Sequence, residues 1–439
     1  MGLFIDAYKN GKCLILDEIN LASKSVLQCI EEALDNNFLS IEIPGKPLNK
    51  IPKHKNFCLI ATQNPNKGLY MRKRQDLGTK FLSRFQIIYF PKFTSDELLL
   101  IAQGLANRFN YKEKYKLKNL VNFHKEWSES SFVENDVQCF TIREIAATIK
   151  ACSEGEKLED TIQIIYGARY PKTKREELNN ILKKYPLLQS NEPLNITIPS
   201  NFPKIFETKS IKETIHKILF CLKNKRHVII AGEEGVGKTQ LAKWISEYWN
   251  NRNIEKIKEN KKKNEFFCIC SENITCADLI GRQRASCEVD AGQQIIEWQS
   301  GFLLNAIEYG KCVVLDCLEE APSTVTERLN SLLDKKYDGK DNIFNVYENP
   351  NNNEILIHDD FRLVCTCEIE NIKKMSPAFI NRFDVIVFEN QLEDLNRNDL
   401  ESFINFLFKN IKYKNNLYIN EDDEEDIVPE SAKTKIEKN

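Results

Sequence analysis

The chain has 439 residues, and its 62 Lys and Arg side chains almost balance its 64 Asp and Glu side chains, which leaves a net charge of −2. This balance excludes a protein that binds nucleic acid through overall basicity, so direct nucleic-acid binding is not expected. With 42% hydrophobic residues the chain can bury sizeable cores, and its length indicates roughly two to four domains. No apolar run approaches the roughly 20 residues of a membrane-spanning helix, so no membrane segment is expected.

Short β-branched and apolar runs between polar loops predict buried parallel strands. In chain order they cover residues 13–16, 57–61, 87–90, 228–231, 266–270, 312–315, 361–365 and 385–388. Apolar residues at helical spacing predict helices over 24–34, 239–249 and 324–333, and a helix-rich stretch that opens with 96–105 and runs to about residue 185. Strands that alternate with helices predict an α/β fold with a parallel sheet.

The chain also contains an internal repeat of long period. Gly11-Lys12-Cys13, Leu16 and Asp17 recur in order as Gly310-Lys311-Cys312, Leu315 and Asp316. Phe57, Leu59 and Thr62 then match Phe361, Leu363 and Thr366, and Phe81, Arg84 and Phe85 match Phe379, Arg382 and Phe383. The sequence therefore predicts two copies of one domain type. Met1 aligns with Ser300, well inside the second copy, so we expect the first copy to lack its N-terminal part.

A phosphate-binding loop is predicted in the second copy. Its residues are Gly232-Glu233-Glu234-Gly235-Val236-Gly237-Lys238-Thr239, which fit G-x-x-x-x-G-K-[ST] between the strand 228–231 and the helix 239–249. The glycines let backbone N–H groups turn toward phosphates, and the helix N-terminus adds partial positive charge. Lys238 should reach the outer phosphates and Thr239 the Mg²⁺ ion. ATP and Mg²⁺ are the expected cofactors.

Such a loop needs an acid on a neighbouring strand for Mg²⁺ and a carboxylate that orients the attacking water. In the second copy, Asp316 is placed to hold Mg²⁺. In the first copy, Asp17 and Glu18 supply both acids. The second copy has Cys317 at the position of Glu18, and a thiol does not replace a carboxylate as a base without cost. Glu319 and Glu320 should point elsewhere. We therefore expect ATP binding with slow or absent hydrolysis.

Four segments resemble motifs of one family. They are Leu14-Ile15-Leu16-Asp17-Glu18-Ile19-Asn20-Leu21-Ala22, Ala61-Thr62-Gln63-Asn64-Pro65, Phe81-Leu82-Ser83-Arg84-Phe85 and Phe140-Thr141-Ile142-Arg143-Glu144. In this order they are similar to the Walker B segment, the first sensor, the arginine-finger run and the second sensor of the midasin and dynein-like AAA+ ATPases. Between them, Gly68-Leu69-Tyr70 continues the likeness. The second copy keeps Asp316, Arg382 and a similar segment from Thr275 to Gly281, but it has Glu368 in place of Asn64.

The resemblance implies two tandem AAA+ P-loop modules, each with a parallel sheet flanked by helices and a helical lid. The segments expected are 1–90, the C-terminal part of the first core; 91–189, its helical lid; 190–210, a linker; 211–390, the second core with Walker A; 391–420, a truncated lid; and 421–439, a charged disordered tail. By resemblance, the catalytic residues are Glu18, Asn64, Arg84, Arg143 and Arg382. The resemblance also implies that Thr239, Asp316 and Asp17 bind the Mg²⁺ ion that accompanies ATP.

In this family each nucleotide lies between modules, and the following module supplies the arginine finger. Arg382 would then reach a nucleotide held by the first copy, which has no phosphate loop, while the second copy has no following module. We therefore expect no complete catalytic site from this chain by itself, and interpret it as a fragment of a much larger protein.

The function implied by the resemblance is ATP-driven remodelling of large ribosomal subunit precursors in the nucleus. The expected partners are neighbouring AAA modules of the same or a longer chain and preribosomal proteins. The alternatives are a degenerate nucleotide-binding scaffold without hydrolysis and a dynein-type motor fragment, although no heptad stalk is evident.

Several other features have simpler interpretations. Met1 to Asp6 lacks the basic stretch of a signal peptide, so the 14 cysteines are expected to be reduced thiols of the cytosol or nucleus. No known zinc motif has the spacing of Cys268-x-Cys270 or Cys365-x-Cys367, so we interpret these cysteines as buried thiols. We interpret the Lys-rich stretches 111–118 and 256–263 as solvent-exposed surface segments, with RNA contacts as the alternative. Instead of acting as arginine fingers, Arg84 and Arg382 could form salt bridges at helix ends.

Overall fold

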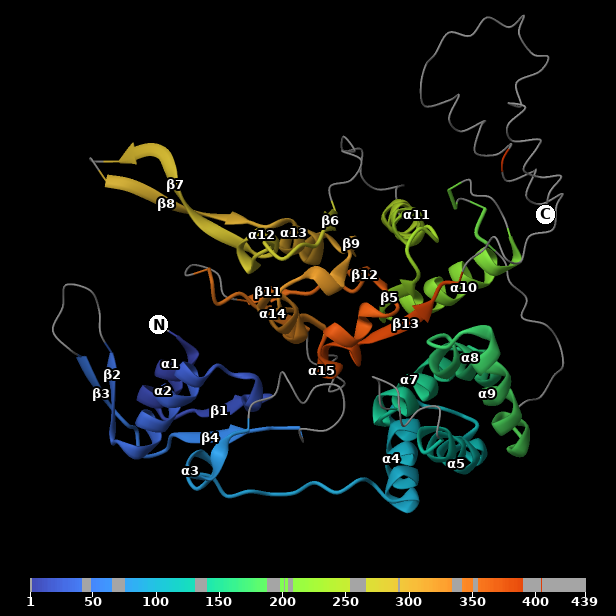
Figure 1. Ribbon diagram of the computed structural model, residues 1–439, viewed down its shortest axis with the longest axis horizontal. Coiled ribbons are helices and arrows are strands. Elements are labelled where there is room, and N and C mark those ends of the chain that lie inside the picture. Colours follow the sequence, from blue (N-terminus) through green and yellow to red (C-terminus); the bar gives the residue numbers. More distant parts are fainter. Residues whose placement is uncertain are drawn as a thin grey trace, which may run out of the picture.

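The computed structural model describes most of the chain in three parts. The described residues are 2–41, 49–64, 76–130, 140–187, 198–200, 202–203, 208–252, 266–290, 293–333, 342–349, 354–389 and 404. We call residues 2–85 the first core, 95–187 the lid and 208–389 the second core (Figure 1). Most of the predicted linker, residues 391–420 except 404, and the predicted tail lie outside the described residues. Within the described ranges, none of the helices has the length and apolarity needed to cross a membrane.

The first core is built around one pair of parallel strands. Its elements are α1 (Leu3–Asn10), β1 (Cys13–Leu16), η1 (Ile19–Leu21), α2 (Lys24–Asp35), β2 (Phe38–Ile41), β3 (Asn49–Pro52), β4 (Cys58–Ala61) and α3 (Gly78–Leu82). β1 pairs with β4 in parallel, and β2 pairs with β3 as a hairpin. One side of the β1–β4 pair packs on Ile19, Leu27 and Phe81, which form a small hydrophobic cluster.

The lid is entirely helical. It consists of α4 (Ser95–Arg108), η3 (Lys114–Lys116), α5 (Leu117–Ser128), α7 (Ile142–Ser153), α8 (Leu158–Gly167) and α9 (Lys172–Lys184). Capping boxes begin α4 at Thr94 and α7 at Thr141, because each threonine lies three residues before a glutamate that bonds back to it. The helices enclose a core that contains the fully buried Trp127, Phe123 and Tyr166.

The second core is a five-stranded parallel sheet with helices on both faces. Its elements are α10 (Lys209–Lys223), β5 (His227–Gly232), α11 (Lys238–Asn251), β6 (Phe267–Ile269), α12 (Cys276–Leu279), β7 (Gly281–Asp290), β8 (Gln293–Ser300), α13 (Phe302–Tyr309), β9 (Cys312–Asp316), η5 (Leu318–Glu320), α14 (Ser323–Leu333), β10 (Ile343–Asn345), β11 (Glu354–Leu356), β12 (Arg362–Glu368), η6 (Asn371–Lys374), α15 (Pro377–Ile380) and β13 (Phe383–Val387). The strand order is β13-β5-β12-β9-β6. α10 and α11 cover one face of the sheet, and α13, α14 and α15 pack on the other.

The repeat seen in the sequence is also present in the backbone. Gly11 and Gly310 end α1 and α13 in the left-handed conformation, with φ of 68° and 64°. A Cβ atom at either glycine would collide with a histidine ring, that of His54 in the first core and that of His358 in the second. Both positions therefore require glycine. The two histidines, to which the sequence patterns gave no role, are matching structural features of the two copies.

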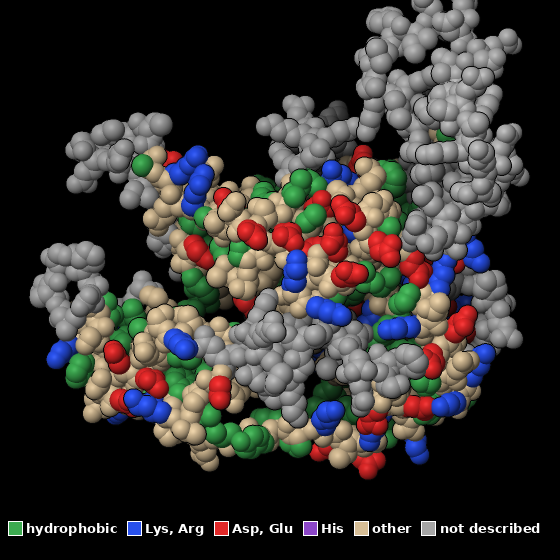
Figure 2. Space-filling view, viewed as in Figure 1, with side chains coloured by type: hydrophobic (Ala, Val, Ile, Leu, Met, Phe, Trp, Pro, Cys, Tyr) green, Lys and Arg blue, Asp and Glu red, His purple; other side chains and the backbone are tan. Residues whose placement is uncertain are grey.

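Seven of the eight predicted strands are confirmed, with ends shifted by at most three residues. The strand predicted at 87–90 is wrong. These residues form no strand, and Tyr89 and Phe90 are 86% and 90% exposed. The corresponding β13 of the second core forms because it pairs with β5, and the described first core contains no equivalent of β5. The stretch instead runs between α3 and α4, with its hydrophobic side chains open in Figure 2.

Three hairpins were missed by the sequence patterns. These are β2–β3, β10–β11 and the long β7–β8 hairpin that extends from the edge of the second core (Figure 1). Their strands are short or lack the apolar runs by which the sheet strands were recognised.

The lid packs against the second core through apolar and charged contacts. Ala151, Ile164 and Ala168 of the lid share one hydrophobic cluster with strands β5 and β13. The Val387 amide donates to the Ala168 carbonyl at 2.9 Å, so the backbones also join. The lid therefore meets the second core along the β13 side of the sheet.

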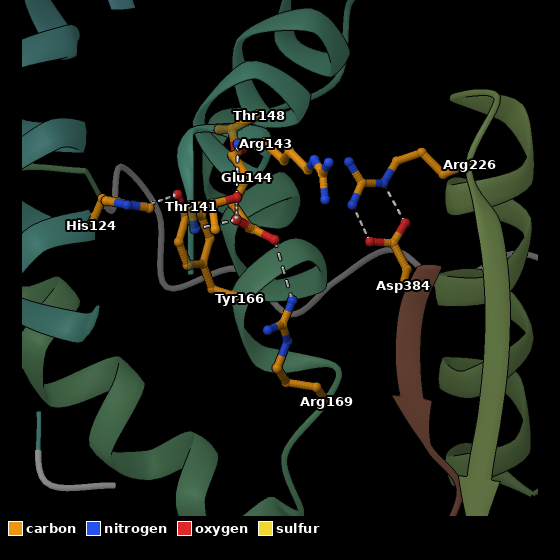
Figure 3. A network of polar contacts seen from close by, with 9 residues as sticks. All are labelled: His124, Thr141, Arg143, Glu144, Thr148, Tyr166, Arg169, Arg226 and Asp384. Atoms are coloured by element: carbon orange, nitrogen blue, oxygen red, sulfur yellow. Dashed lines mark hydrogen bonds and ion pairs between the residues drawn. The ribbon is translucent and has the colours of Figure 1, made fainter. Parts of the chain in front are cut away.

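Buried charges line this contact (Figure 3). Arg226, just before β5, forms a two-pronged pair with Asp384 of β13. On the lid side, Glu144 caps α7 by accepting from the Thr141 amide at 2.6 Å and lies 3.6 Å from the Arg169 guanidinium. The Asp384 and Glu144 carboxylates raise the pKa of Arg226 against the opposing effect of burial. The guanidinium therefore stays charged at the junction of lid and core.

Replacing Arg226 alone should destabilise the second core strongly. Arg226→Met leaves the Asp384 carboxylate buried without its main partner, so we expect the free energy of unfolding to fall by about 3–5 kcal/mol. The double variant Arg226→Met, Asp384→Leu removes both charges and should recover most of this loss. Urea unfolding followed by tryptophan fluorescence measures both variants. A double variant as unstable as the single one would contradict the pairing.

Candidate nucleotide site

The phosphate loop lies at the carboxyl end of β5, which is flanked by β13 and β12 in the sheet of the second core. β5 is buried along its whole length and ends at Gly232, where an added Cβ would lie 2.4 Å from the Phe388 carbonyl oxygen. Gly235 and Gly237 have φ of 80° and 94°, a region that glycine adopts without strain, and open space surrounds their missing Cβ positions. α11 then begins at Lys238. The loop thus joins a rigid strand to the N-terminus of a 14-residue helix, the geometry that binds phosphate groups.

Lys238 reaches across this loop. Its ammonium group donates to the carbonyl oxygens of Gly232 at 2.9 Å and Glu233 at 2.6 Å. The positive charge therefore lies over the loop rather than in solvent. A phosphate that entered the loop would meet the ammonium group as a ready donor.

Three side chains from three elements form a hydrogen-bonded chain beside the loop. The Thr239 hydroxyl, from the start of α11, donates to the Asp316 carboxylate at 2.8 Å. The Thr366 hydroxyl of β12 donates to the same carboxylate at 2.6 Å. Asp316 is 5% exposed at the end of β9 and is held in one orientation by these two donors. A threonine hydroxyl and a carboxylate are hard oxygen ligands of the kind that Mg²⁺ prefers.

The first core repeats part of this arrangement. The Thr62 hydroxyl donates to the Asp17 carboxylate at 2.5 Å, as Thr366 does to Asp316. The Glu18 amide donates to the Thr62 hydroxyl at 3.1 Å, and the Cys317 amide donates to the Thr366 hydroxyl at 3.0 Å. The two threonines thus orient the acid in both copies. Their recurrence in the sequence was the available signal, but no role was assigned to them.

Glu18 and Cys317 occupy equivalent places. Both have a left-handed backbone, with φ of 51° and 54°. The Glu18 side chain is buried and accepts a hydrogen bond from the Asn64 amide group. At Cys317 burial, assisted by the charge of Asp316, raises the pKa of the thiol. The thiol is therefore neutral at pH 7, and the second core has no carboxylate where the first has Glu18.

Comparison with known proteins identifies the family. The profile of the AAA domain, dynein-related subfamily, matches residues 2–85 and 227–383, which is more than half of the chain. The chain belongs to this AAA subfamily. Two midasins match over nearly the whole chain, so the chain is a midasin-like AAA+ protein. Midasin from Dictyostelium discoideum is 24% identical over 91% of the chain, and midasin from Giardia intestinalis is 22% identical over 87%.

The chain spans only 7% and 9% of the length of these two relatives. A solved structure, a closed-state reconstruction of Hsp104 with ATPγS and FITC casein, matches 92% of this chain and 67% of its own. Its identity of 14% and TM-score of 0.33 are too low to support any argument about arrangement.

The position predicted to be the first sensor has different contacts in the two AAA cores. Glu368 accepts a hydrogen bond from the Asn371 side chain at 2.5 Å, and its amide donates to the Glu319 carboxylate at 2.7 Å. Asn20, the counterpart of Glu319, holds the matching position with the opposite polarity, because its side-chain amide donates to the Asn64 carbonyl at 3.0 Å. Burial raises the pKa of Glu319. Glu319 therefore holds the end of β12, an anchoring contact that the sequence reading did not foresee.

The structure places the three predicted arginines in different surroundings. Arg84 donates to Asp35 at 2.6 Å and lies 3.2 Å from Glu31, so it ties α3 to α2 within the first AAA core. Arg382 donates to the Ala378 carbonyl at 2.6 Å, and Arg143 is an exposed residue at the start of α7 (Figure 3). Their roles as fingers and second sensor remain predictions. The stretch Gly68-Leu69-Tyr70 lies outside the described residues.

Cysteines do not form a metal centre in the described ranges. Cys270, Cys365 and Cys367 are buried in the hydrophobic core of the second AAA domain. The described residues contain no group of three or more His, Cys, Asp or Glu side chains arranged to hold a metal ion.

Thr366 offers a test of the hydrogen-bonded chain. Thr366→Val removes the hydroxyl that donates to Asp316 and accepts from the Cys317 amide. Losing these two hydrogen bonds should cost about 1–2 kcal/mol of stabilising free energy at the site. We expect roughly tenfold more Mg²⁺ to be needed for half-maximal ATP binding, measured by calorimetric titration at several Mg²⁺ concentrations. Thr366→Ser keeps the hydroxyl and should behave like the unmodified chain. Equal losses in both variants would mean that Thr366 acts through packing alone.

Proposed function

We propose that the second AAA core binds ATP with Mg²⁺. The observation that carries this proposal is the 2.8 Å contact between Thr239 and Asp316 beside a glycine-shaped loop. The open space at Gly235 and Gly237 fits a cradle for phosphates, and the oxygen donors fit Mg²⁺. Lys238 would hold the outer phosphates, while Thr239 and Asp316 would hold Mg²⁺, directly or through water. Bound Mg²⁺ would neutralise charge on the phosphate oxygens.

We further propose that this site hydrolyses ATP slowly. The position that Glu18 fills in the first core is filled in the second by the neutral thiol of Cys317. Glu319, a half-buried carboxylate two residues after Cys317, is engaged with the Glu368 amide instead. The second core therefore has the groups that bind a nucleotide without an evident base for water.

At the level of the whole protein, we propose that the chain is a two-module section of a midasin-like mechanoenzyme. Its ATP-driven cycle would remodel large ribosomal subunit precursors in the nucleus, in contact with neighbouring AAA modules. The subfamily match and the two midasin relatives support this proposal. Asp17, Glu18 and Arg382 would then act in a site that is shared between modules.

The size of the endogenous polypeptide tests this role. An antibody against residues 172–210 should detect, in a cell extract, a band at least about ten times heavier than the 439-residue chain, in line with the length of the relatives. A band at the mass of the chain itself would contradict the mechanoenzyme and favour a free-standing nucleotide-binding scaffold.

Lys238→Ala tests the nucleotide site directly. Losing a charged donor to phosphate should weaken ATP binding by about 10- to 100-fold. Lys243→Ala is a matched control, because Lys243 lies on the same helix but packs over the Phe267 ring. Fluorescence titration with a labelled ATP analogue measures both variants. Unchanged affinity in Lys238→Ala would overturn the site assignment.

Cys317→Glu tests the proposed cause of slow hydrolysis. A carboxylate on the same left-handed backbone should raise ATP turnover at least about tenfold, because general bases contribute factors of this size or larger. Cys317→Ala should leave turnover at the original level. Phosphate release under saturating Mg-ATP measures the rates. If Cys317→Glu binds ATP tightly yet shows no gain even when the flanking modules are restored, the scaffold alternative is favoured.

A further inference from the structure

Two positions beside the phosphate loop carry acids in the second core where the first core carries amides. Asn20 and Asn64 of the first core correspond to Glu319 and Glu368 of the second. An amide side chain can donate hydrogen bonds to a negatively charged group, whereas an ionised carboxylate can only accept. The copy that has the phosphate loop has therefore lost two donors and gained two acids at the ends of its strands.

Glu368 lies at the edge of the phosphate loop. It is the last residue of β12 and pairs in register with Gly232, the first residue of the loop. The backbone amide of Ile369 donates to the Gly232 carbonyl at 3.3 Å, so the two segments also join just beyond the strands. The Asn371 side chain holds the Glu368 carboxylate at 2.5 Å. Strand register and this hydrogen bond together keep an acid next to the start of the loop.

Glu319 brings a second carboxylate to the same strand end. One of its oxygens accepts from the Glu368 amide at 2.7 Å, and the other is buried and has no hydrogen-bond partner among the described residues. Burial raises the pKa of Glu319, and the charges of Glu368 and Glu320 add to this effect. The acids at the ends of β9 and β12 therefore repel one another before any ligand enters.

The ammonium group of Lys238 acts on the same two strand ends. Burial raises the pKa of the Cys317 and Cys367 thiols, and the charge of Lys238 works in the opposite direction on both. Cys317 follows β9 directly and Cys367 lies one residue before the end of β12. A phosphate held by Lys238 would therefore lie in the field of the carboxylates on these strands.

The charge around these strand ends differs between the two copies. Residues 316–320 and 366–371 of the second core include five acids and no basic residue. The matching residues 17–21 and 62–67 of the first core include two acids. Each phosphate added to a bound nucleotide therefore meets more negative charge in the second core than the residues of the first core would present.

From this placement we infer that the phosphate loop of the second core binds a nucleoside diphosphate more tightly than the triphosphate, and that Glu368 determines this preference. The loop amides, the N-terminus of α11 and Lys238 serve the phosphates of either nucleotide. The last phosphate of ATP brings further negative charge toward the acids, and like charges repel strongly in a partly buried site. The inference rests on the proposed nucleotide binding and specifies its ligand as ADP with Mg²⁺. The neutral thiol of Cys317 agrees with it, since neither feature favours turnover.

Calorimetric titration of the full chain with Mg-ADP and with Mg-ATP, at the same free Mg²⁺ concentration, tests this inference. We expect Mg-ADP to bind at least about tenfold more tightly, a factor that one additional like-charge contact in a partly buried site supplies. Chromatography of the nucleotide after each titration verifies that the ATP stayed intact.

Variants of Glu368 assign the cause of the preference. Glu368→Gln removes the charge but keeps an oxygen that can accept from Asn371, and Glu368→Asn introduces the residue type of Asn64. Both should tighten Mg-ATP binding roughly tenfold and leave the affinity for Mg-ADP within about twofold. Glu320→Gln is the matched control, because Glu320 is an exposed acid that lies 3.4 Å from the Lys374 ammonium group. It should leave the ratio of the two affinities unchanged.

Two outcomes would overturn the inference. The first is equal or tighter binding of Mg-ATP by the unmodified chain. The second is an equal change of both affinities in Glu368→Gln, which would mean that Glu368 only supports the folding of the loop. Binding of both nucleotides without preference overturns this inference alone, whereas binding of neither nucleotide overturns the proposed nucleotide site as well.

Discussion

The pairing of β5 with both β12 and β13 is the constraint on which the second core depends. The strand is buried along its length, and its carboxyl end opens into the phosphate loop. α10 and α11, on either side of it in sequence, cover one whole face of the sheet. The same strand orders the contact with the lid, because β13 can present its backbone to Ala168 only while it is held against β5. Fold, phosphate loop and lid contact therefore share one element.

The first core, as far as the structure describes it, contains no equivalent of that strand, and the consequences are visible in its exposed face. Its β1–β4 pair keeps Asp17, Glu18, Thr62 and Asn64 in mutual contact, since these residues need only the two strands and the turns that follow them. The apolar side chains on its other face stay exposed. We propose that the parts of a hydrolytic site are divided between the two cores, with the phosphate loop in the second core and the paired acids Asp17 and Glu18 in the first. In the family to which the chain belongs, such parts come together between modules, which is why we propose that they act within a longer assembly.

Much of the fold and of the candidate site could be predicted from the sequence. The repeat of Gly11 and Asp17 as Gly310 and Asp316 located both cores, and the spacing of Gly232 to Thr239 located the loop. Local signals suffice there, because a left-handed glycine or a phosphate loop needs a particular residue at a particular place. The failures are non-local. Residues 87–90 have the composition of a strand but pair with no strand in the described ranges, and sequence composition carries no information about whether a partner strand is present. The anchoring by Glu319 and the pairing of Arg226 with Asp384 also join residues far apart in the chain.

The central claim is that the second core of this chain binds ATP and the first does not. Hydrogen exchange of the full chain with and without Mg-ATP tests this claim most directly. Our account predicts that Mg-ATP slows amide exchange in residues 232–241 and at the end of β9, while residues 13–20 and 57–64 of the first core exchange at unchanged rates. Protection in the first core without protection of the loop would contradict the account, as would no protection at all at saturating nucleotide.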